Sequence, residues 1–269
     1  MNVVTTCFPG GKHKCLTMSY DDGRTFDRRL VGIFNQYGIR GTFHIISDAT
    51  DGREGFVPKD ELAALYRGHE VACHTTQHPT SARCPLPSVT RMVLDDRVAL
   101  EQAVGYPVRG LSYPNGSHTP EIRAMLPGCG IRYSRVVGNS DSFAMPEDLM
   151  QWQATCHHNH HLMELGQAFC DLYKTQYLFL MYVWGHSYEF DLDDNWQLIE
   201  DFCRMMGGRE DIWYATNIEI VDYLDTFRAL QFAADNSFVY NPSAASAWLR
   251  VNGGEPFEVP GGTLMQLNG

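Results

Sequence analysis

Short apolar runs alternate along the chain with stretches in which apolar residues recur every three or four positions. Residues 15–20 predict a strand, and residues 27–37 predict a helix with Leu30, Ile33 and Phe34 on one side and a stop at Gly38. The alternation continues with predicted strands at 41–46, 70–74, 111–114 and 177–184 and predicted helices at 59–67 and 88–104. Strands and helices that follow one another in this way are typical of a parallel α/β fold.

The character of the chain changes after Phe232. Residues 236–269 contain Asn-Pro, Gly-Gly and Pro-Gly-Gly turns between the short runs 247–251 and 257–259. We therefore expect a main body over residues 1–232 and a small β-rich extension over residues 233–269. The extension is predicted to pack on the main body as a pair of hairpins or to form a subunit contact, so that a homo-oligomer is among the expected assemblies.

Composition and charge narrow the class of protein. Charged residues make up 20% and hydrophobic residues 44% of the chain, which is an ordinary globular balance. The net charge of −11 argues against a nucleic acid partner. No apolar run approaches the roughly 20 residues of a membrane span, and Lys12, His13 and Lys14 stand where a signal peptide would need an apolar core. The eight cysteines form no CxxC pair, which favours reduced thiols, and the expected location is cytoplasmic.

Two short segments at predicted strand ends carry the chemistry. They are Ser19-Tyr20-Asp21-Asp22-Gly23 and His74-Thr75-Thr76-Gln77-His78. A carboxylate with two imidazoles, here from Asp22, His74 and His78, suits zinc or a related transition metal such as cobalt or nickel. Three protein ligands leave a coordination position for water, and the neighbouring Asp21 could take a proton from it. The sequence therefore predicts a metal-dependent enzyme whose site lies at the carboxyl ends of the strands.

The motifs resemble those of the polysaccharide deacetylase (NodB-homology) family. The first segment is similar to the family's Thr-Phe-Asp-Asp-Gly motif, and the second matches its His-Ser/Thr-x-x-His motif. Tyr113-Pro114-Asn115-Gly116 resembles the third motif, and the apolar run 178–184 that leads to His186 resembles the fifth. The resemblance covers roughly residues 15–227 and implies a distorted (β/α) barrel.

The resemblance also implies roles for individual residues. Asp21 would be the general base, His186 the general acid, and the backbone N–H of Asn115 would stabilise the oxyanion. The ligands of one divalent metal, zinc above all, would be Asp22, His74 and His78. The substrate would be an N-acetylated carbohydrate.

Some positions depart from the family pattern. The third motif of many members begins with an arginine, but Ser112 stands at that position here, and Arg109 lies three residues earlier. The fourth motif has no clean match. Trp152 is a candidate for lining the pocket, and Glu189 or Asp191 for orienting His186. We interpret the histidine tract 157–161 as a solvated loop before a helix, in which one histidine could face the pocket, in preference to a second metal site.

Three functional hypotheses follow from these features. The favoured one is deacetylation of an N-acetylated sugar or glycan precursor. The second is hydrolysis of another small amide or of an O-acetyl ester. The third is a glycan-binding protein that has lost turnover, which the missing third-motif arginine supports and the retained Asp21 and His186 oppose.

Overall fold

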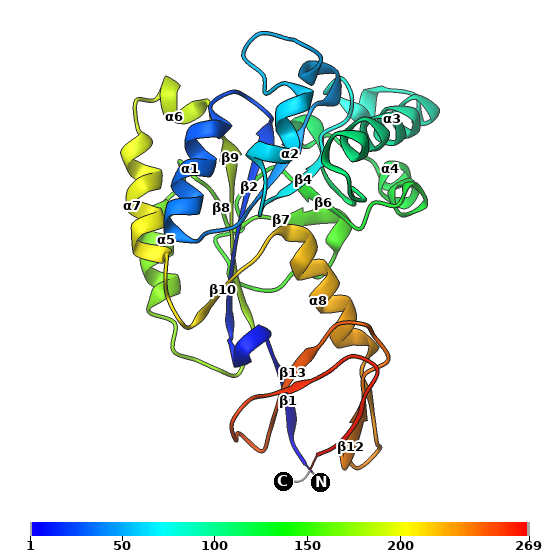
Figure 1. The fold of residues 1–269 in the computed structure, drawn as a ribbon, viewed down its shortest axis with the longest axis vertical. Helices are drawn as coiled ribbons and strands as arrows, with labels where there is room; N and C mark the ends of the chain where they lie inside the picture. Colours follow the sequence, from blue (N-terminus) through cyan, green and yellow to red (C-terminus); the bar gives the residue numbers. More distant parts are fainter. Residues whose placement is uncertain (1, 268–269) are drawn as a thin grey trace.

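The computed structural model describes residues 2–267, and its centre is a curved sheet (Figure 1). The strands of this sheet are β2 (Lys14–Asp22), β3 (Gly41–Ile45), β4 (Glu70–Cys73), β5 (Gly110–Ser112), β6 (Tyr133–Val136), β7 (Trp152–Gln153), β8 (Cys156–His157), β9 (Phe179–His186) and β10 (Ile212–Tyr214). Their order is β7-β6-β5-β4-β3-β2-β9-β8, and β10 pairs with the start of β2. All these pairings are parallel, so the predicted parallel α/β fold is confirmed.

Helices cover the outside of the sheet (Figure 1). They are α1 (Asp27–Tyr37), α2 (Leu62–Leu65), α3 (Leu86–Val104), α4 (Pro120–Met125), α5 (Leu162–Cys170), α6 (Glu189–Leu192), α7 (Trp196–Met206) and α8 (Asn217–Ala229). The predicted helix over 27–37 is confirmed and ends at Gly38, whose φ of 67° is the left-handed conformation that glycine adopts easily. The helix predicted over 59–67 is shorter, because a 3₁₀ turn precedes α2. Within residues 2–267, no helix combines the length and apolarity needed to cross a membrane.

The two central strands are buried along nearly their whole length. Eight of the nine residues of β2 are buried, as is most of β9. A parallel strand with both faces covered needs apolar side chains on both, which explains the continuous run in β9. On the outer side, α7 packs one face against the sheet and its neighbours, with Trp196, Ile199, Phe202, Cys203 and Met206 buried. This spacing of three and four residues is the helical stripe expected of such a contact.

The interior of the curve contains buried polar groups at the end of the sheet where the strands begin. Glu70, at the start of β4, accepts hydrogen bonds from the hydroxyls of Thr42 (2.9 Å) and Tyr133 (2.8 Å) and from the backbone N–H of Ile218 (2.8 Å). Burial raises the pKa of Glu70 to about 7, although the three hydrogen bonds oppose this shift. These contacts tie three strands and α8 together below the site.

A small β appendage lies at the far end of the molecule, below α8 and β10 in Figure 1. Its strands are β1 (Val4–Cys7), β11 (Gln231–Phe232), β12 (Phe238–Tyr240), β13 (Ala247–Val251), β14 (Phe257–Val259) and β15 (Leu264–Gln266). They form two antiparallel sheets, β1-β13-β14 and β11-β12-β15. The N-terminal strand β1 thus belongs to a sheet of the appendage, which the sequence did not indicate. The division of the chain at residue 232 stays a prediction.

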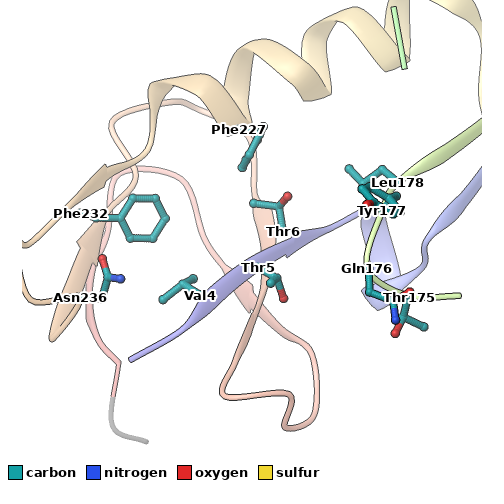
Figure 2. Close-up of a pocket in the computed structure, with 10 residues that line it drawn as sticks. All are labelled: Val4, Thr5, Thr6, Thr175, Gln176, Tyr177, Leu178, Phe227, Phe232 and Asn236. Atoms are coloured by element: carbon teal, nitrogen blue, oxygen red, sulfur yellow. The ribbon is translucent and has the colours of Figure 1, made fainter. Parts of the chain in front are cut away.

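A cavity of about 350 Å³ lies where the appendage meets the barrel. Figure 2 shows that its lining comes from β1, from the segment before β9 and from the region around the end of α8. The side chains are Val4, Thr5, Thr6, Thr175, Gln176, Tyr177, Leu178, Phe227, Phe232 and Asn236. None of these ten lining residues is a carboxylate, histidine or cysteine.

Candidate metal centre and active site

The structure brings Asp22, His74 and His78 together at the carboxyl end of the sheet. Asp22 is the last residue of β2, and His74 follows β4 directly. Asp22 Oδ1 lies 3.5 Å from His74 Nε2 and 3.9 Å from His78 Nε2. One donor atom from each residue lies within 4.8 Å of the other two. The three side chains therefore present their donor atoms to a common point.

The donor atoms are in the state that a metal ion requires. Asp22 Oδ1 and His74 Nε2 are buried and have no hydrogen-bond partner among residues 2–267. His74 Nδ1 lies 2.9 Å from the carbonyl oxygen of Ser112, so Nδ1 carries the proton and Nε2 offers its lone pair. Burial lowers the pKa of His74 to about 3, which keeps the imidazole neutral. Unpaired buried polar atoms are costly, and a divalent cation would satisfy both.

Backbone conformations that are rare for residues other than glycine are concentrated here. Asp22, Thr75, His78 and Asn115 have φ values of 80°, 62°, 55° and 57°. Such left-handed residues cost free energy and persist where the surrounding structure enforces them, often at functional sites. Thr75 helps to enforce the loop, because its hydroxyl accepts a hydrogen bond from the backbone N–H of His78 (3.1 Å).

Asp21 lies beside the three donors and is held by two side chains. Its Oδ1 accepts a hydrogen bond from the Ser112 hydroxyl (3.1 Å), and its Oδ2 accepts one from the Arg135 guanidinium. The exposed fractions of the Asp21 and Arg135 side chains are 4% and 0%. Burial by itself would raise the pKa of Asp21, but the Arg135 charge lowers it well below its usual range. Asp21 is therefore a carboxylate at any pH at which the protein would work.

The partner of Asp21 is a residue that the sequence analysis missed. Arg109, the candidate three residues before Ser112, points elsewhere and forms a bidentate pair with Asp222 (2.7 Å). Arg135 comes from the next strand, β6, and stands in register with Ser112 of β5. Neighbours in register on parallel strands project to the same face, so both reach Asp21. No motif marks Arg135, because the contact depends on the pairing of β5 with β6.

His186 ends β9 and stands in register with Asp21 of β2. Its Nδ1 lies 3.2 Å from Glu189 Oε1. Burial lowers the pKa of His186, but Glu189 and the charge of Asp21 outweigh it, so the pKa is raised above its usual value. Of the two candidates for orienting His186, Glu189 makes the contact and Asp191 is exposed.

These residues line one cavity of about 390 Å³. Its wall consists of Asp21, Asp22, His74, His78, Tyr113, Asn115, Val137, Trp184, His186 and Tyr188. All six residues assigned to the site from the sequence are among them. Trp152 is not, and that suggestion was wrong: the residue is buried in the core, where it packs edge-on against Tyr133 and Tyr182. Trp184 supplies a tryptophan to the wall instead.

The histidine tract is partly buried, and the expectation of a solvated loop is wrong for His158. Its side chain is fully buried and stacks on Phe190 with ring centroids 4.1 Å apart. His157 Nε2 and His158 Nε2 lie 3.0 and 3.3 Å from Glu189 Oε2. One donor atom from each of His157, His158 and Glu189 lies within 4.8 Å of the other two, so these residues form a second group that could hold a metal ion. The N–H of Asn159 donates to His157 Nδ1 (3.2 Å), which leaves the proton of a neutral His157 on Nε2.

Comparisons with known proteins agree with this architecture. The sequence model of the polysaccharide deacetylase family matches residues 9–134. A Mycobacterium smegmatis protein named as a polysaccharide deacetylase superposes with a TM-score of 0.63 at 15% identity, over 85% of this chain and 96% of that one. A family 4 carbohydrate esterase from Streptomyces lividans, solved with acetate, gives 0.52 at 14% identity, over 75% of this chain and 91% of that one.

The chain spans 55% of the length of a third protein, a Streptococcus pyogenes deacetylase, at 16% identity and a TM-score of 0.43, with 45% of this chain covered. The resemblance to the polysaccharide deacetylase family is confirmed, and the curled parallel sheet is the distorted (β/α) barrel of such proteins. At these identities the structural likeness establishes the fold alone. The chemistry has to be argued from the site.

Proposed function

We propose that this protein is a metal-dependent hydrolase that removes the acetyl group from an N-acetylated sugar or glycan precursor. The proposal is carried by two buried donor atoms, Asp22 Oδ1 and His74 Nε2, which have no hydrogen-bond partner within residues 2–267 and lie beside Asp21 and His186. Asp22, His74 and His78 would hold zinc or a similar transition metal. When bound, such an ion polarises a carbonyl group and lowers the pKa of water.

Asp21 would act as the general base. Its carboxylate lies at the cavity wall, and Arg135 and Ser112 hold both oxygens in fixed directions. Correct placement matters first for proton transfer. The Arg135 charge keeps the carboxylate ionised, although the lowered pKa also makes it a weaker base. The guanidinium that many family members take from the third motif is present here from another strand. This removes the main support for a non-catalytic glycan-binding protein.

His186 would donate a proton to the leaving nitrogen. It stands opposite Asp21 in register, and its raised pKa favours the protonated ring that a general acid needs. Asn115 would stabilise the oxyanion through its backbone N–H. Its left-handed φ of 57° sets the direction of the peptide at the cavity wall, and its side chain is turned toward the Thr80 hydroxyl (3.4 Å).

The cavity suits a sugar unit that carries an acetamido group. Its volume of about 390 Å³ lies at the lower end for small-molecule sites. Three aromatic side chains, Tyr113, Trp184 and Tyr188, line the cavity. Tyr113 and Trp184 are buried, so the half-buried Tyr188 is the one of the three that would stack on a pyranose ring. Hydrolysis of the alternative substrates, a small amide or an O-acetyl ester, would also need a water molecule as nucleophile and Asp21 as general base.

Acetate release from a panel of N-acetylated sugars, with zinc, cobalt or nickel added, tests the proposal. Asp21→Asn should lower the rate at least about 100-fold, the usual loss for a general base. The matched control is Asp60→Asn, since Asp60 is an exposed carboxylate in the turn before α2. An Asp21→Asn rate close to that of wild type would remove Asp21 from the mechanism.

Metal content tests the ligand set independently of substrate. His74→Ala should bind one metal ion fewer per chain than wild type. The control is His160→Ala, because the ring of His160 pairs with Asp141 (2.9 Å) and is not part of the set Asp22, His74 and His78. This variant should keep its metal. Equal metal content in the two variants would contradict the ligand assignment.

A further inference from the structure

A second set of metal-ligand side chains lies apart from the one that contains Asp22. It consists of His157 at the end of β8, His158 directly after it, and Glu189 at the start of α6. Glu189 Oε2 lies 3.0 Å from His157 Nε2 and 3.3 Å from His158 Nε2. Donor atoms at about 2.0–2.1 Å from a tetrahedral ion are about 3.3 Å from each other, so these separations suit a shared ion.

The second set has nearly the dimensions of the first. In the first set, Asp22 Oδ1 lies 3.5 Å from His74 Nε2 and 3.9 Å from His78 Nε2, and the centroids of the two imidazole rings are 4.6 Å apart. In the second set, the ring centroids of His157 and His158 are 4.4 Å apart. Both sets combine one carboxylate with two imidazoles, which suits zinc and related transition metals. The likeness of the two sets therefore extends from residue type to spacing.

His158 supplies independent evidence for a ligand. Its side chain is fully buried, and neither ring nitrogen makes a hydrogen bond within residues 2–267. Burial lowers the pKa of His158 to about 3, so the ring is neutral and can offer a lone pair. Its Nδ1 lies against Gly185, where a Cβ would be 2.0 Å from it, and its Nε2 lies near Glu189. A buried imidazole without a partner is costly, and a cation beside Nε2 would supply one.

Glu189 and His157 differ in how ready they are to bind a cation. Burial by itself would raise the pKa of Glu189, but the neighbouring His157 and His186 lower it below its usual range, so the carboxylate is ionised. Its Oε2 accepts the backbone N–H of His186 (3.1 Å), which holds this oxygen beside the two histidines. His157 Nδ1 accepts the N–H of Asn159, so His157 must move its proton from Nε2 to Nδ1 before Nε2 can bind. The lost hydrogen bond makes the second set weaker than the first.

We infer that His157, His158 and Glu189 form a second binding site for a divalent transition metal such as zinc, weaker than the first. The side chains of His157 and Glu189 are 18% and 24% exposed, so an ion can enter from solvent. The bound ion would join the end of β8 to the start of α6. The histidine tract would thus hold the metal site that its sequence alone did not favour, and this site does not depend on the proposed hydrolase activity.

Zinc titration of chelator-stripped protein, followed by isothermal calorimetry, tests the inference without any substrate. Wild type should bind two ions per chain in two steps of different affinity, and His74→Ala should keep the weaker step alone. His158→Phe retains a ring that can stack on Phe190, and Glu189→Gln retains the size of the side chain. Both variants should keep the tighter step. Their second step should be weaker by more than about 100-fold, since loss of an outer partner of a ligand already costs about 10–100-fold.

The control is His160→Ala, because His160 lies in the same tract, pairs with Asp141 (2.9 Å) and belongs to neither set. It should keep both steps. Crystals soaked in zinc should show an anomalous peak between His157, His158 and Glu189. A second step that is unchanged in both His158→Phe and Glu189→Gln would overturn the inference, as would one ion per wild-type chain at saturation. Absence of acetate release would instead count against the proposed function alone.

Discussion

Replacing Arg135 with leucine should expose how much the protein depends on one buried charge pair. Asp21 and Arg135 are almost inaccessible to solvent, with side-chain exposures of 4% and 0%. The Asp21 carboxylate accepts hydrogen bonds from Arg135 and from the Ser112 hydroxyl. In Arg135→Leu it would stay buried and keep the Ser112 hydroxyl, but it would lose the guanidinium. Removing one partner of a buried pair costs about 3–5 kcal/mol, since the other charge stays desolvated. We expect a loss of unfolding free energy in this range at neutral pH.

The matched control is Arg132→Leu. Arg132 is three residues earlier and pairs with Asp225 at the surface, where the two side chains are 50% and 40% exposed. Exposed pairs contribute about 0–1 kcal/mol, so this variant should stay close to wild type. Urea unfolding followed by circular dichroism measures both proteins. The double variant Arg135→Leu with Asp21→Asn should recover part of the loss, because no buried charge remains.

The effect of Arg135→Leu should depend on pH. The folded-state pKa of Asp21 lies below its unfolded value in wild type, so the pair stabilises the protein above about pH 4 and loses that contribution as pH falls through the folded pKa. Without Arg135, burial should raise the pKa of Asp21 above its unfolded value, and stability should fall as pH rises. The gap between the two proteins should therefore be widest near pH 7. A gap under about 1 kcal/mol there would refute the reasoning from burial.

Three further outcomes follow from the structure. The pKa of Glu70 is about 7 in the folded protein and lower in the unfolded chain. The free energy of unfolding should therefore fall by on the order of 3 kcal/mol between pH 4 and 7. Urea unfolding of Glu70→Gln should show no such dependence on pH. Gly110→Ala should lower the free energy of unfolding by about 1–3 kcal/mol, because its new Cβ would lie 2.1 Å from the Tyr133 hydroxyl oxygen. In the control Gly128→Ala the new Cβ meets no atom within 4 Å, so thermal unfolding should be nearly that of wild type. Zinc at 100 times its Kd should raise the unfolding free energy of wild type by about 2.7 kcal/mol, and Asp22→Asn should show a much smaller gain in the same calorimetric scan.

The residues of the candidate site could be predicted because they sit in local motifs. Asp21 and Asp22 are adjacent, and His74 and His78 are four residues apart. Each segment follows a strand that the alternation of apolar runs revealed. In a parallel sheet the carboxyl ends of strands meet at one edge, so the segments had to come close once the fold class was known.

The supporting contacts could not be predicted from the sequence. Arg135 reaches Asp21 because β6 pairs with β5, and His157 reaches Glu189 because β8 pairs with β9. The alternation of apolar and polar residues does not indicate either pairing, because β6 and β8 are short strands of four and two residues. For the same reason the pairing of β1 with the C-terminal strands came only from the structure.

The sequence by itself determined the elements and the donor types, because hydrophobic period and chemically specific side chains are local properties. The tertiary structure alone decided that Asp21 meets Arg135 and that Glu189 lies beside both His157 and His186. These contacts depend on strand register and on distances between segments that are far apart in the sequence, and a shift of one residue would turn each side chain to the opposite face.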